Sequence, residues 1–232
     1  MKKFMKHVLP LLLIVCLVVA LGCTAFATDD FPFTDVPENS WYYDYVNAVY
    51  QAGIMKGVSE TEFAPHATMT RAMLVTVLYR LIEEDPSTDY PTSGFYDVAN
   101  DQWYTEAVDW GVYNGFISGV EPRYFHPDDP VSREQAAALF FRIASAYVWV
   151  LEDGSEIPWD NGARADLSRY PDANNVFDYA KEAFQWAVAN DIIEGTTASE
   201  NDPTPILAPG QSATRAQVAA IIVRFVIYLD NL

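Results

Sequence analysis

Three stretches of one pattern decide the fold: PHATMTRAMLVTVLYRL at 65–81, PDDPVSREQAAALFFRI at 127–143 and PGQSATRAQVAAIIVRF at 209–225. In each stretch an arginine stands six residues after the first proline, and a second arginine stands nine residues after the first. A pattern that recurs three times indicates internal repeats. The first arginines are Arg71, Arg133 and Arg215, and the second arginines are Arg80, Arg142 and Arg224.

A helix start is predicted at the first arginine of each stretch. The residue before it is Ser or Thr, which caps a helix by accepting a backbone hydrogen bond. Ser132 with Gln135 and Thr214 with Gln217 complete the reciprocal capping box, whereas Met73 in the first stretch cannot accept the second hydrogen bond. The apolar runs that follow predict helices that continue through 74–82, 136–148 and 218–229.

The same features precede each of these stretches. An aromatic residue lies close before an aspartate: Phe33 before Asp35, Tyr96 directly before Asp97 (a register shifted by one), and Tyr170 before Asp172. A further aromatic residue follows, at Trp41, Trp103 and Tyr179. A glycine stands 16 residues later, at Gly57, Gly119 and Gly195. A large apolar residue leads into the stretch, at Phe63, Phe125 and Leu207.

A first helix is predicted between the second aromatic residue and the glycine. In repeat 1 it covers 41–52, with Asn39 or Ser40 as its cap and apolar residues at helical spacing. Gly53 ends this helix, and Gly115 and Asp191 hold the same position in the other repeats. Each repeat is therefore a helix, a loop and a second helix, which predicts a mainly α protein. Repeats 1, 2 and 3 span 33–82, 95–148 and 170–229.

Two linkers and one insertion complete this part of the chain. The linker 83–94 is acidic and contains prolines, and the linker 151–169 is longer and contains Trp159. Residues 196–205 form an insertion in repeat 3 that is rich in Thr, Ser and Pro.

Residues 1–27 have the features of a secretory signal peptide. Lys2, Lys3 and Lys6 precede an apolar run at 9–21, and a small-x-small cleavage site follows at 25–27. The run is shorter than the ~20 residues that span a bilayer. An alternative is that Cys23 is a lipidated cysteine. Either interpretation places the protein outside the cytoplasm.

The chain is strongly acidic, with 14 Lys and Arg against 32 Asp and Glu, for a net charge of −18. Removal of the signal peptide would remove three lysines and make the charge more negative. Binding to nucleic acid depends on Lys and Arg that neutralise phosphates, so this composition excludes a nucleic-acid partner. An anionic partner requires a local positive site.

The repeated first arginine is the strongest candidate binding residue. A cation at a helix N-terminus is disfavoured by about 0.3–1 kcal/mol, so three in one position suggest a compensating function. Free N–H groups at a helix start favour an anion, and a guanidinium adds a bidentate clamp. We therefore expect Arg133→Ala to weaken binding and to leave its helix intact. The alternative is that each arginine pairs with the aspartate of its own repeat.

The other repeated residues admit both a structural and a functional interpretation. The aromatic residues at 41, 103 and 179 are core residues by default, or they stack against the face of a sugar. The glycines at 57, 119 and 195 mark turns with positive φ, or they let a ligand approach the backbone. The second arginines lie late in their helices, where a cation is favourable, and are interpreted as structural.

No pattern indicates an enzyme active site or a cofactor. His66 and His126 occupy different positions in their repeats, and no His and Cys cluster suggests zinc. Asp128 and Asp129 lack the spaced oxygen ligands of a calcium loop. Nothing singles out a pair of carboxylates for glycoside hydrolysis. We therefore predict no metal and no catalysis.

Phe-x-Asp-Val followed by Trp-Tyr, then Gly-Ile-x-x-Gly, Phe-x-Pro and Thr-Arg-Ala, resembles the S-layer homology (SLH) repeat of bacterial surface proteins. The resemblance implies a pseudo-threefold spindle of three repeats around a central helix bundle. It also implies that grooves between the repeats bind a secondary cell-wall polysaccharide, commonly pyruvylated. Met73 and Tyr179 depart from the family pattern, and the insertion at 196–205 lies near the third groove.

The resemblance assigns glycan binding to one set of repeated positions. These are Arg71, Arg133, Arg215, Trp41, Trp103, Tyr179, Gly57, Gly119, Gly195, Asp35, Asp97 and Asp172. Our leading interpretation is a non-catalytic module that anchors on the cell wall through this polysaccharide. The alternative is a surface structural or adhesion protein that assembles with other surface-layer protein subunits. A wall-modifying enzyme is disfavoured because the sequence shows no separate catalytic domain.

Overall fold

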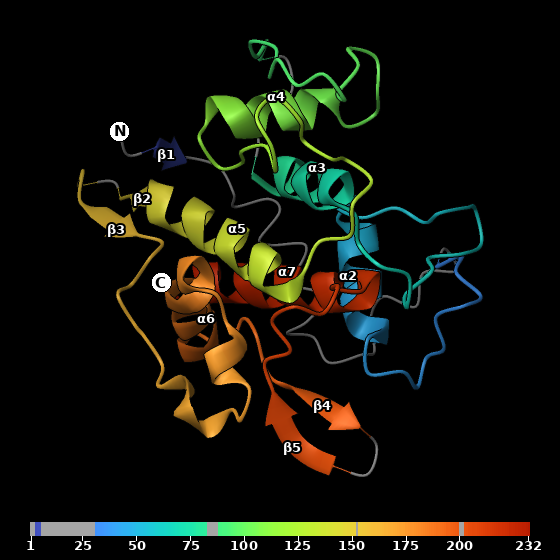
Figure 1. The fold of residues 1–232 in the computed structure, drawn as a ribbon, viewed down its shortest axis with the longest axis vertical. Coiled ribbons are helices and arrows are strands. Elements are labelled where there is room, and N and C mark those ends of the chain that lie inside the picture. The colour runs from blue at the N-terminus through green and yellow to red at the C-terminus, as the bar shows by residue number, and fades with distance from the viewer. Residues whose placement is uncertain (1–2, 6–30, 83–87, 152, 200–201) are drawn as a thin grey trace. The chain divides into compact units, whose positions relative to one another are not determined.

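Helices are the main elements of the protein. The computed structural model describes residues 3–5, 31–82, 88–151, 153–199 and 202–232 (Figure 1). Each repeat contributes two helices joined by a loop, which confirms the predicted mainly α fold. The pairs are α2 (Tyr43–Gln51) with α3 (Arg71–Ile82), α4 (Thr105–Tyr113) with α5 (Arg133–Ala146), and α6 (Asp178–Ala189) with α7 (Arg215–Asp230). The predicted signal peptide lies outside the described residues, except for β1 (Lys3–Met5).

The second helix of each repeat begins at the predicted arginine because the preceding residue caps it. At α5, the Ser132 hydroxyl accepts from the Gln135 N–H (3.2 Å), and the Gln135 side chain accepts from the Ser132 N–H (2.9 Å). Thr214 and Gln217 form the same box at α7. At α3, Thr70 accepts the corresponding hydrogen bond (3.2 Å) from the methionine N–H, and the thioether cannot complete the box.

The first helix of repeat 1 begins later than predicted and ends within one residue of the predicted end. α2 starts at Tyr43 rather than at Trp41, and the side chain of its N-cap residue, Tyr42, does not cap the helix. The predicted cap Ser40 instead donates its hydroxyl to the Pro37 carbonyl (2.7 Å). The second residue after the first helix of each repeat has a positive φ, at Gly53 (70°), Gly115 (73°) and Asp191 (54°).

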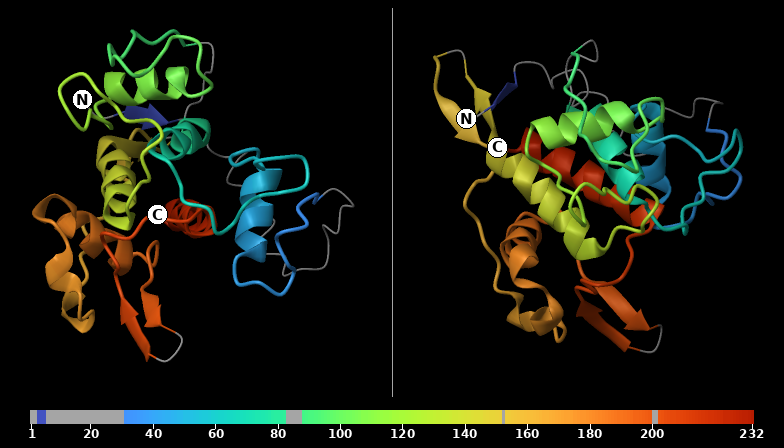
Figure 2. Two further views of the ribbon diagram at one scale, coloured as in Figure 1. Left: turned by 45° about the vertical axis from the view of Figure 1, so that its right-hand side comes forward. Right: turned by 45° about the horizontal axis from the view of Figure 1, so that its top comes forward.

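The structure contains two β-hairpins that the sequence did not predict (Figures 1 and 2). α5 ends at Ala146, short of the predicted 148, and β2 (Tyr147–Val150) then pairs antiparallel with β3 (Glu156–Pro158) and parallel with β1. The run Tyr-Val-Trp-Val is aromatic and β-branched, which favours a strand over a continued helix. The insertion in repeat 3 forms a second antiparallel hairpin, from β4 (Thr196–Ser199) and β5 (Asp202–Ile206).

The linker between repeats 2 and 3 is a packed part of the fold. Two short 3-10 helices, η1 (Leu167–Arg169) and η2 (Ala173–Asn175), follow β3. Trp159 is fully buried, and its ring stacks on Tyr147 with centroids 4.9 Å apart. Its side chain therefore belongs to the core and not to a flexible connection.

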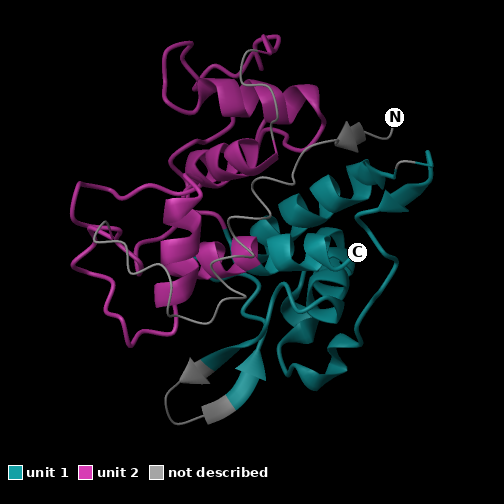
Figure 3. Cartoon of the chain, turned by 180° about the vertical axis from the view of Figure 1, so that it is seen from behind, with its two compact units in different colours: residues 1–6, 132–213, 224–232 teal, residues 7–131, 214–223 magenta. Residues whose placement is uncertain are grey.

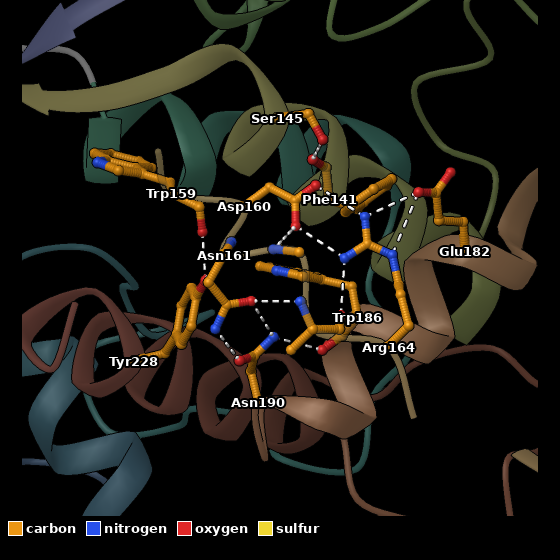
Figure 4. A network of polar contacts seen from close by, with 12 residues as sticks. Phe141, Ser145, Trp159, Asp160, Asn161, Arg164, Glu182, Trp186, Asn190 and Tyr228 are labelled. Carbon is orange, nitrogen blue, oxygen red and sulfur yellow. Dashed lines mark hydrogen bonds and ion pairs between the residues drawn. The ribbon is translucent and has the colours of Figure 1, made fainter. Parts of the chain in front are cut away.

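A polar network ties the same linker to α6 and its C-terminal end (Figure 4). Arg164 donates to both oxygens of Asp160 (2.9 and 2.8 Å) and to Glu182 on α6 (2.8 Å). Asn161 donates to the side chain of Asn190, directly after α6 (2.7 Å). These contacts fix the course of the linker without helix or strand hydrogen bonds.

The chain divides into two compact units (Figure 3). Unit 1 contains residues 1–6, 132–213 and 224–232, and unit 2 contains residues 7–131 and 214–223. In unit 1 the fully buried Phe225 contacts the rings of Phe140 and Trp186, with centroids 5.3 and 6.1 Å apart. In unit 2 Phe63 and Trp110 are among the fully buried side chains.

Candidate functional site

The repeated aspartate holds a loop of its own repeat. In repeat 2, Asp97 accepts hydrogen bonds from the N–H groups of Phe125 (2.8 Å) and His126 (2.7 Å). The same distances recur for Asp35 with Phe63 and Ala64, and for Asp172 with Leu207 and Ala208. The second residue of each pair has a positive φ, at Ala64 (57°), His126 (59°) and Ala208 (50°). Because residues with a side chain rarely adopt this conformation, the carboxylate stabilises a strained turn.

Each first arginine reaches the loop of another repeat, in an interaction that we call the arginine latch. Arg133 donates from Nε to the Leu207 carbonyl (2.8 Å) and from Nη2 to the Glu194 carbonyl (3.1 Å), both in repeat 3. Arg71 of repeat 1 donates in the same way to the carbonyls of Phe125 and Ser118 in repeat 2 (2.9 and 3.3 Å). Arg215 of repeat 3 donates to the carbonyls of Phe63 and Lys56 in repeat 1 (2.7 and 2.6 Å). In each repeat the aspartate therefore accepts a hydrogen bond from the N–H of one loop residue, and the latch arginine donates to the carbonyl of that same residue.

The charges around the latches also connect different repeats. Burial lowers the pKa of Arg133 and of Arg215, and the charges of Asp172 and Asp35, respectively, oppose this effect. Each of these carboxylates belongs to the repeat that the arginine reaches, which differs from the pairing within one repeat considered above. Burial alone would raise the pKa of Asp97, but its two backbone N–H donors hold that pKa below the usual value.

The N–H groups at the helix starts are occupied. At α5, Arg133 donates to the Gln211 carbonyl (2.9 Å) and Glu134 donates to the Pro209 carbonyl (3.1 Å). The other starts are paired in the same way, Arg71 and Ala72 with Asp129 and Pro127, and Arg215 and Ala216 with Ala67 and Pro65. The expectation that free helix-start donors bind an anion is therefore wrong, because loop carbonyls of another repeat already use them.

The repeated glycines allow close packing. The glycines with positive φ are found elsewhere, so the interpretation of the repeated glycines as positive-φ turns is wrong. A Cβ on Gly57 would lie 2.4 Å from Phe33 Cε1 and 2.5 Å from the Ser59 carbonyl oxygen. The same conflict with an aromatic ring arises at Gly119 (Phe95 Cε1, 3.0 Å) and at Gly195 (Tyr170 Cε1, 2.9 Å).

Phe95 is a repeated residue that the sequence analysis missed. It stands two residues before Asp97, as Phe33 and Tyr170 do before their aspartates, and its ring stacks on Phe125 with centroids 5.7 Å apart. The adjacent Tyr96 is exposed. The register of repeat 2 is therefore not shifted, and the spacing to the aspartate was the signal that distinguishes the two aromatic residues.

The second set of aromatic residues lies on the surface. Trp41, Trp103 and Tyr179 are 60%, 59% and 53% exposed. Their default interpretation as core residues is therefore wrong. An exposed flat ring is available for stacking against a ligand.

A pocket of about 430 Å³ in unit 2 brings together one predicted site residue from each repeat: Gly57, Trp103 and Arg215. The rest of its lining is Met55, Lys56, Val58, Met69, Met73, Thr76, Val77 and Arg80. Three of the lining side chains are cationic and none is acidic, although the chain carries a net charge of −18. The other predicted site residues lie outside this lining. Asp97 lines a different pocket with three further acidic residues.

A family comparison agrees with this three-part geometry. The sequence profile of the S-layer homology domain matches residues 32–72, 94–137 and 169–219, more than half of the chain. Each segment begins one residue before Phe33, Phe95 or Tyr170, which supports the corrected register of repeat 2. The chain belongs to the S-layer homology (SLH) domain family.

The SLH chain is similar to parts of several larger proteins. It is 30% identical over 228 residues to an endoglucanase of Bacillus sp. (strain KSM-635), covering 95% of the chain and 22% of the endoglucanase. It is 30% identical over 185 residues to the surface-layer 125 kDa protein of Lysinibacillus sphaericus, covering 80% and 14%. It is 25% identical over 114 residues to a cellulosome-anchoring protein of Acetivibrio thermocellus, covering 47% and 25%. The chain thus spans a quarter or less of these relatives.

Two cations of the SLH pocket were not assigned to binding by the sequence. Lys56 is one of two lysines after residue 27, and this rarity was a usable signal. Arg80 was interpreted as structural, and it does donate to the Ile54 carbonyl (3.3 Å), but it also lines the pocket. The structural interpretation of Arg224 agrees with its ion pair to Glu194 (2.7 Å).

Among the residues that the structure describes, no group of three or more His, Cys, Asp or Glu side chains is placed to hold a metal ion. The helices described here also include none with the length and apolar character of a membrane span.

Proposed function

We propose that this SLH chain is a non-catalytic module that anchors at the cell surface by binding an anionic, pyruvylated secondary cell-wall polysaccharide. The observation that carries the proposal is the pocket in unit 2, which Lys56, Arg80 and Arg215 line without any carboxylate. In a chain with 32 acidic and 14 basic side chains, a pocket with cations alone favours an anion at that place. The surface-layer and cellulosome-anchoring relatives support a location at the cell surface.

Some pocket residues would bind the charged group of the ligand, and others would contact its sugar ring or leave space for it. Arg215 uses Nε and Nη2 for the latch, and a guanidinium with five N–H donors retains others for a ligand carboxylate. Lys56 is exposed and adds a second positive charge. Trp103 offers a flat ring to the apolar face of a sugar. Gly57 keeps the backbone at the pocket free of a side chain.

The arginine latches support the pseudo-threefold spindle as the arrangement of the three repeats. They lead from repeat 1 to 2, from 2 to 3 and from 3 to 1, with the same donor atoms each time. A set of equivalent links that returns to its first member is the pattern expected of a threefold arrangement. In this arrangement the second helices form the central bundle.

A surface-layer protein is a second candidate partner. The similarity to the surface-layer 125 kDa protein favours it, since such a relative suggests assembly with other surface subunits. Export through residues 1–27, or lipidation at Cys23, would bring the chain to either partner.

Co-sedimentation with purified wall sacculi tests the proposal. We expect the mature chain to pellet with intact sacculi and to remain in solution after acid has removed their secondary polymers. Trp103→Ala should reduce pelleting at least tenfold, because the stacking face of the pocket is lost. The matched control is Tyr113→Ala, which removes an exposed ring outside the pocket lining. Binding that persists after acid treatment would favour peptidoglycan or a protein receptor instead.

A further inference from the structure

Two departures from the repeated pattern meet on the surface of α5. Repeat 3 has Tyr179 where the other repeats have tryptophan, and repeat 2 has Glu134 where the others have Ala72 and Ala216. The ring of Tyr179 stacks on that of Phe177, and the charge of the Glu134 carboxylate acts on the Tyr179 hydroxyl. Glu134 also accepts a hydrogen bond from the Phe177 N–H (3.2 Å). Glu134, Phe177 and Tyr179 all belong to unit 1.

The contact places a buried carboxylate at the base of an exposed aromatic surface. Glu134 is 5% exposed, whereas the rings of Tyr179 and Phe177 are more than half exposed and stack with centroids 6.3 Å apart. Burial and the Glu134 charge raise the pKa of Tyr179 to about 12, so the phenol keeps its proton.

The matching positions at α3 have the opposite electrostatic character. There Ala72 stands in place of the glutamate and Trp103 in place of the tyrosine, and the pocket lining contains no acid. Arg142 on α5 corresponds to Arg80 on α3, and its charge acts on Tyr179. At α5 the charges of both Glu134 and Arg142 therefore act on the aromatic residue, and the negative one repels an approaching anion at short range.

We propose that Glu134 and Tyr179 determine ligand specificity at α5, where they exclude the anionic group that the α3 pocket binds. The pair leaves two exposed rings that suit an uncharged saccharide unit, since aromatic stacking needs no charge. The two helices thus present different chemistry to one polymer. This inference deepens the proposed function and rests on it for the identity of the ligand.

The double substitution E134A/Y179W tests the inference because it reproduces the residues of the α3 site. The probe is anionic fragments of secondary wall polymer, titrated calorimetrically into the mature chain. We expect the number of anion sites per chain to rise by one relative to wild type. In a Trp103→Ala background, which lacks the α3 site, the same pair should still add one anion site at α5. Glu38→Ala is the control for net charge, since it removes an exposed carboxylate elsewhere and should add no site.

The outcomes separate the two proposals. An unchanged number of sites in a folded E134A/Y179W chain would overturn the role of the pair. If the double variant is unstable, Glu134→Gln is the second test, because it keeps the shape of the side chain and removes its charge. This variant must bind the anionic fragment at α5 at least tenfold more tightly than the wild-type chain does. A wild-type chain that binds no anionic fragment refutes the proposed function. The specificity inference is then decided by whether E134A/Y179W acquires one site.

Discussion

An arginine can stabilise a fold and contact a ligand at once, because its five N–H donors point in different directions. Arg133 and Arg215 are 4% and 6% exposed, and two donors of each bind loop carbonyls of another repeat. The sequence predicted the position of these residues but not their partners. Spacing along the chain cannot show which repeat supplies a carbonyl. The hydrogen bonds by which these arginines stabilise the fold were therefore not predictable.

Arg133→Ala should destabilise the protein, contrary to the expectation from the helix dipole alone. Removing a cation from a helix start gains about 0.3–1 kcal/mol. Two hydrogen bonds from a charged donor contribute about 1.5–3 kcal/mol each, so their loss outweighs that gain. We expect a net loss of about 2–4 kcal/mol of unfolding free energy in urea. Arg142→Ala, at an exposed position, should stay within about 0.5 kcal/mol. Equal stability of both variants would exclude the latch as a stabilising contact.

Asp97→Asn should remove stability that depends on pH. The asparagine side chain has one carbonyl oxygen, and its NH2 group would face one of the two backbone N–H donors. That donor would lose its acceptor, so we expect the free energy of unfolding to fall by about 1–3 kcal/mol at neutral pH. The folded-state pKa of Asp97 is lowered, so its contribution is complete above the unfolded pKa of about 3.9 and is lost as the pH falls through the folded value. Urea unfolding from pH 7 to pH 2 should show the two proteins converge at the acidic end. A constant difference would contradict this origin.

At the scale of elements, the sequence predicted what local chemistry determines. Caps and apolar spacing placed the starts of α3, α5 and α7, and turn residues placed the ends of the first helices. The β2–β3 hairpin was missed because Tyr147–Val150 continues the apolar run of α5, and periodicity does not separate a short strand from a longer helix. The candidate site was predicted in part, since Gly57, Trp103 and Arg215 do meet in one pocket.

Two glycines of one loop region should respond differently to alanine. A Cβ at Gly57 meets a backbone carbonyl at 2.5 Å, which cannot move without the loop, so we expect Gly57→Ala to cost more than about 2 kcal/mol. A Cβ at Gly53 meets nothing within 4 Å, and its cost is the positive φ alone, about 1 kcal/mol. Thermal unfolding of both variants measures the difference. A larger effect at Gly53 would show that conformation rather than close packing governs this loop.

For the whole molecule, net charge and the pocket act in opposite directions on an anionic wall. The net charge of −18 repels the wall at long range, whereas the pocket attracts an anion at short range. Salt screens the distant repulsion first, because the Debye length is ~8 Å at physiological ionic strength. We expect association with immobilised polymer to stay constant or to accelerate from low to moderate salt. A steep loss of affinity would show instead that exposed, long-range attraction dominates.

The latch of Arg215 also has a mechanical consequence. It bonds positions 56 and 63 to a side chain 159 and 152 residues further along the chain. Tension applied between repeat 1 and repeat 3 must open this contact before the intervening segment can lengthen. A surface protein under fluid drag would thus resist extension through the contact between its third and its first repeat. In an optical trap, Arg215→Ala should lower the first rupture force and leave the total extension unchanged.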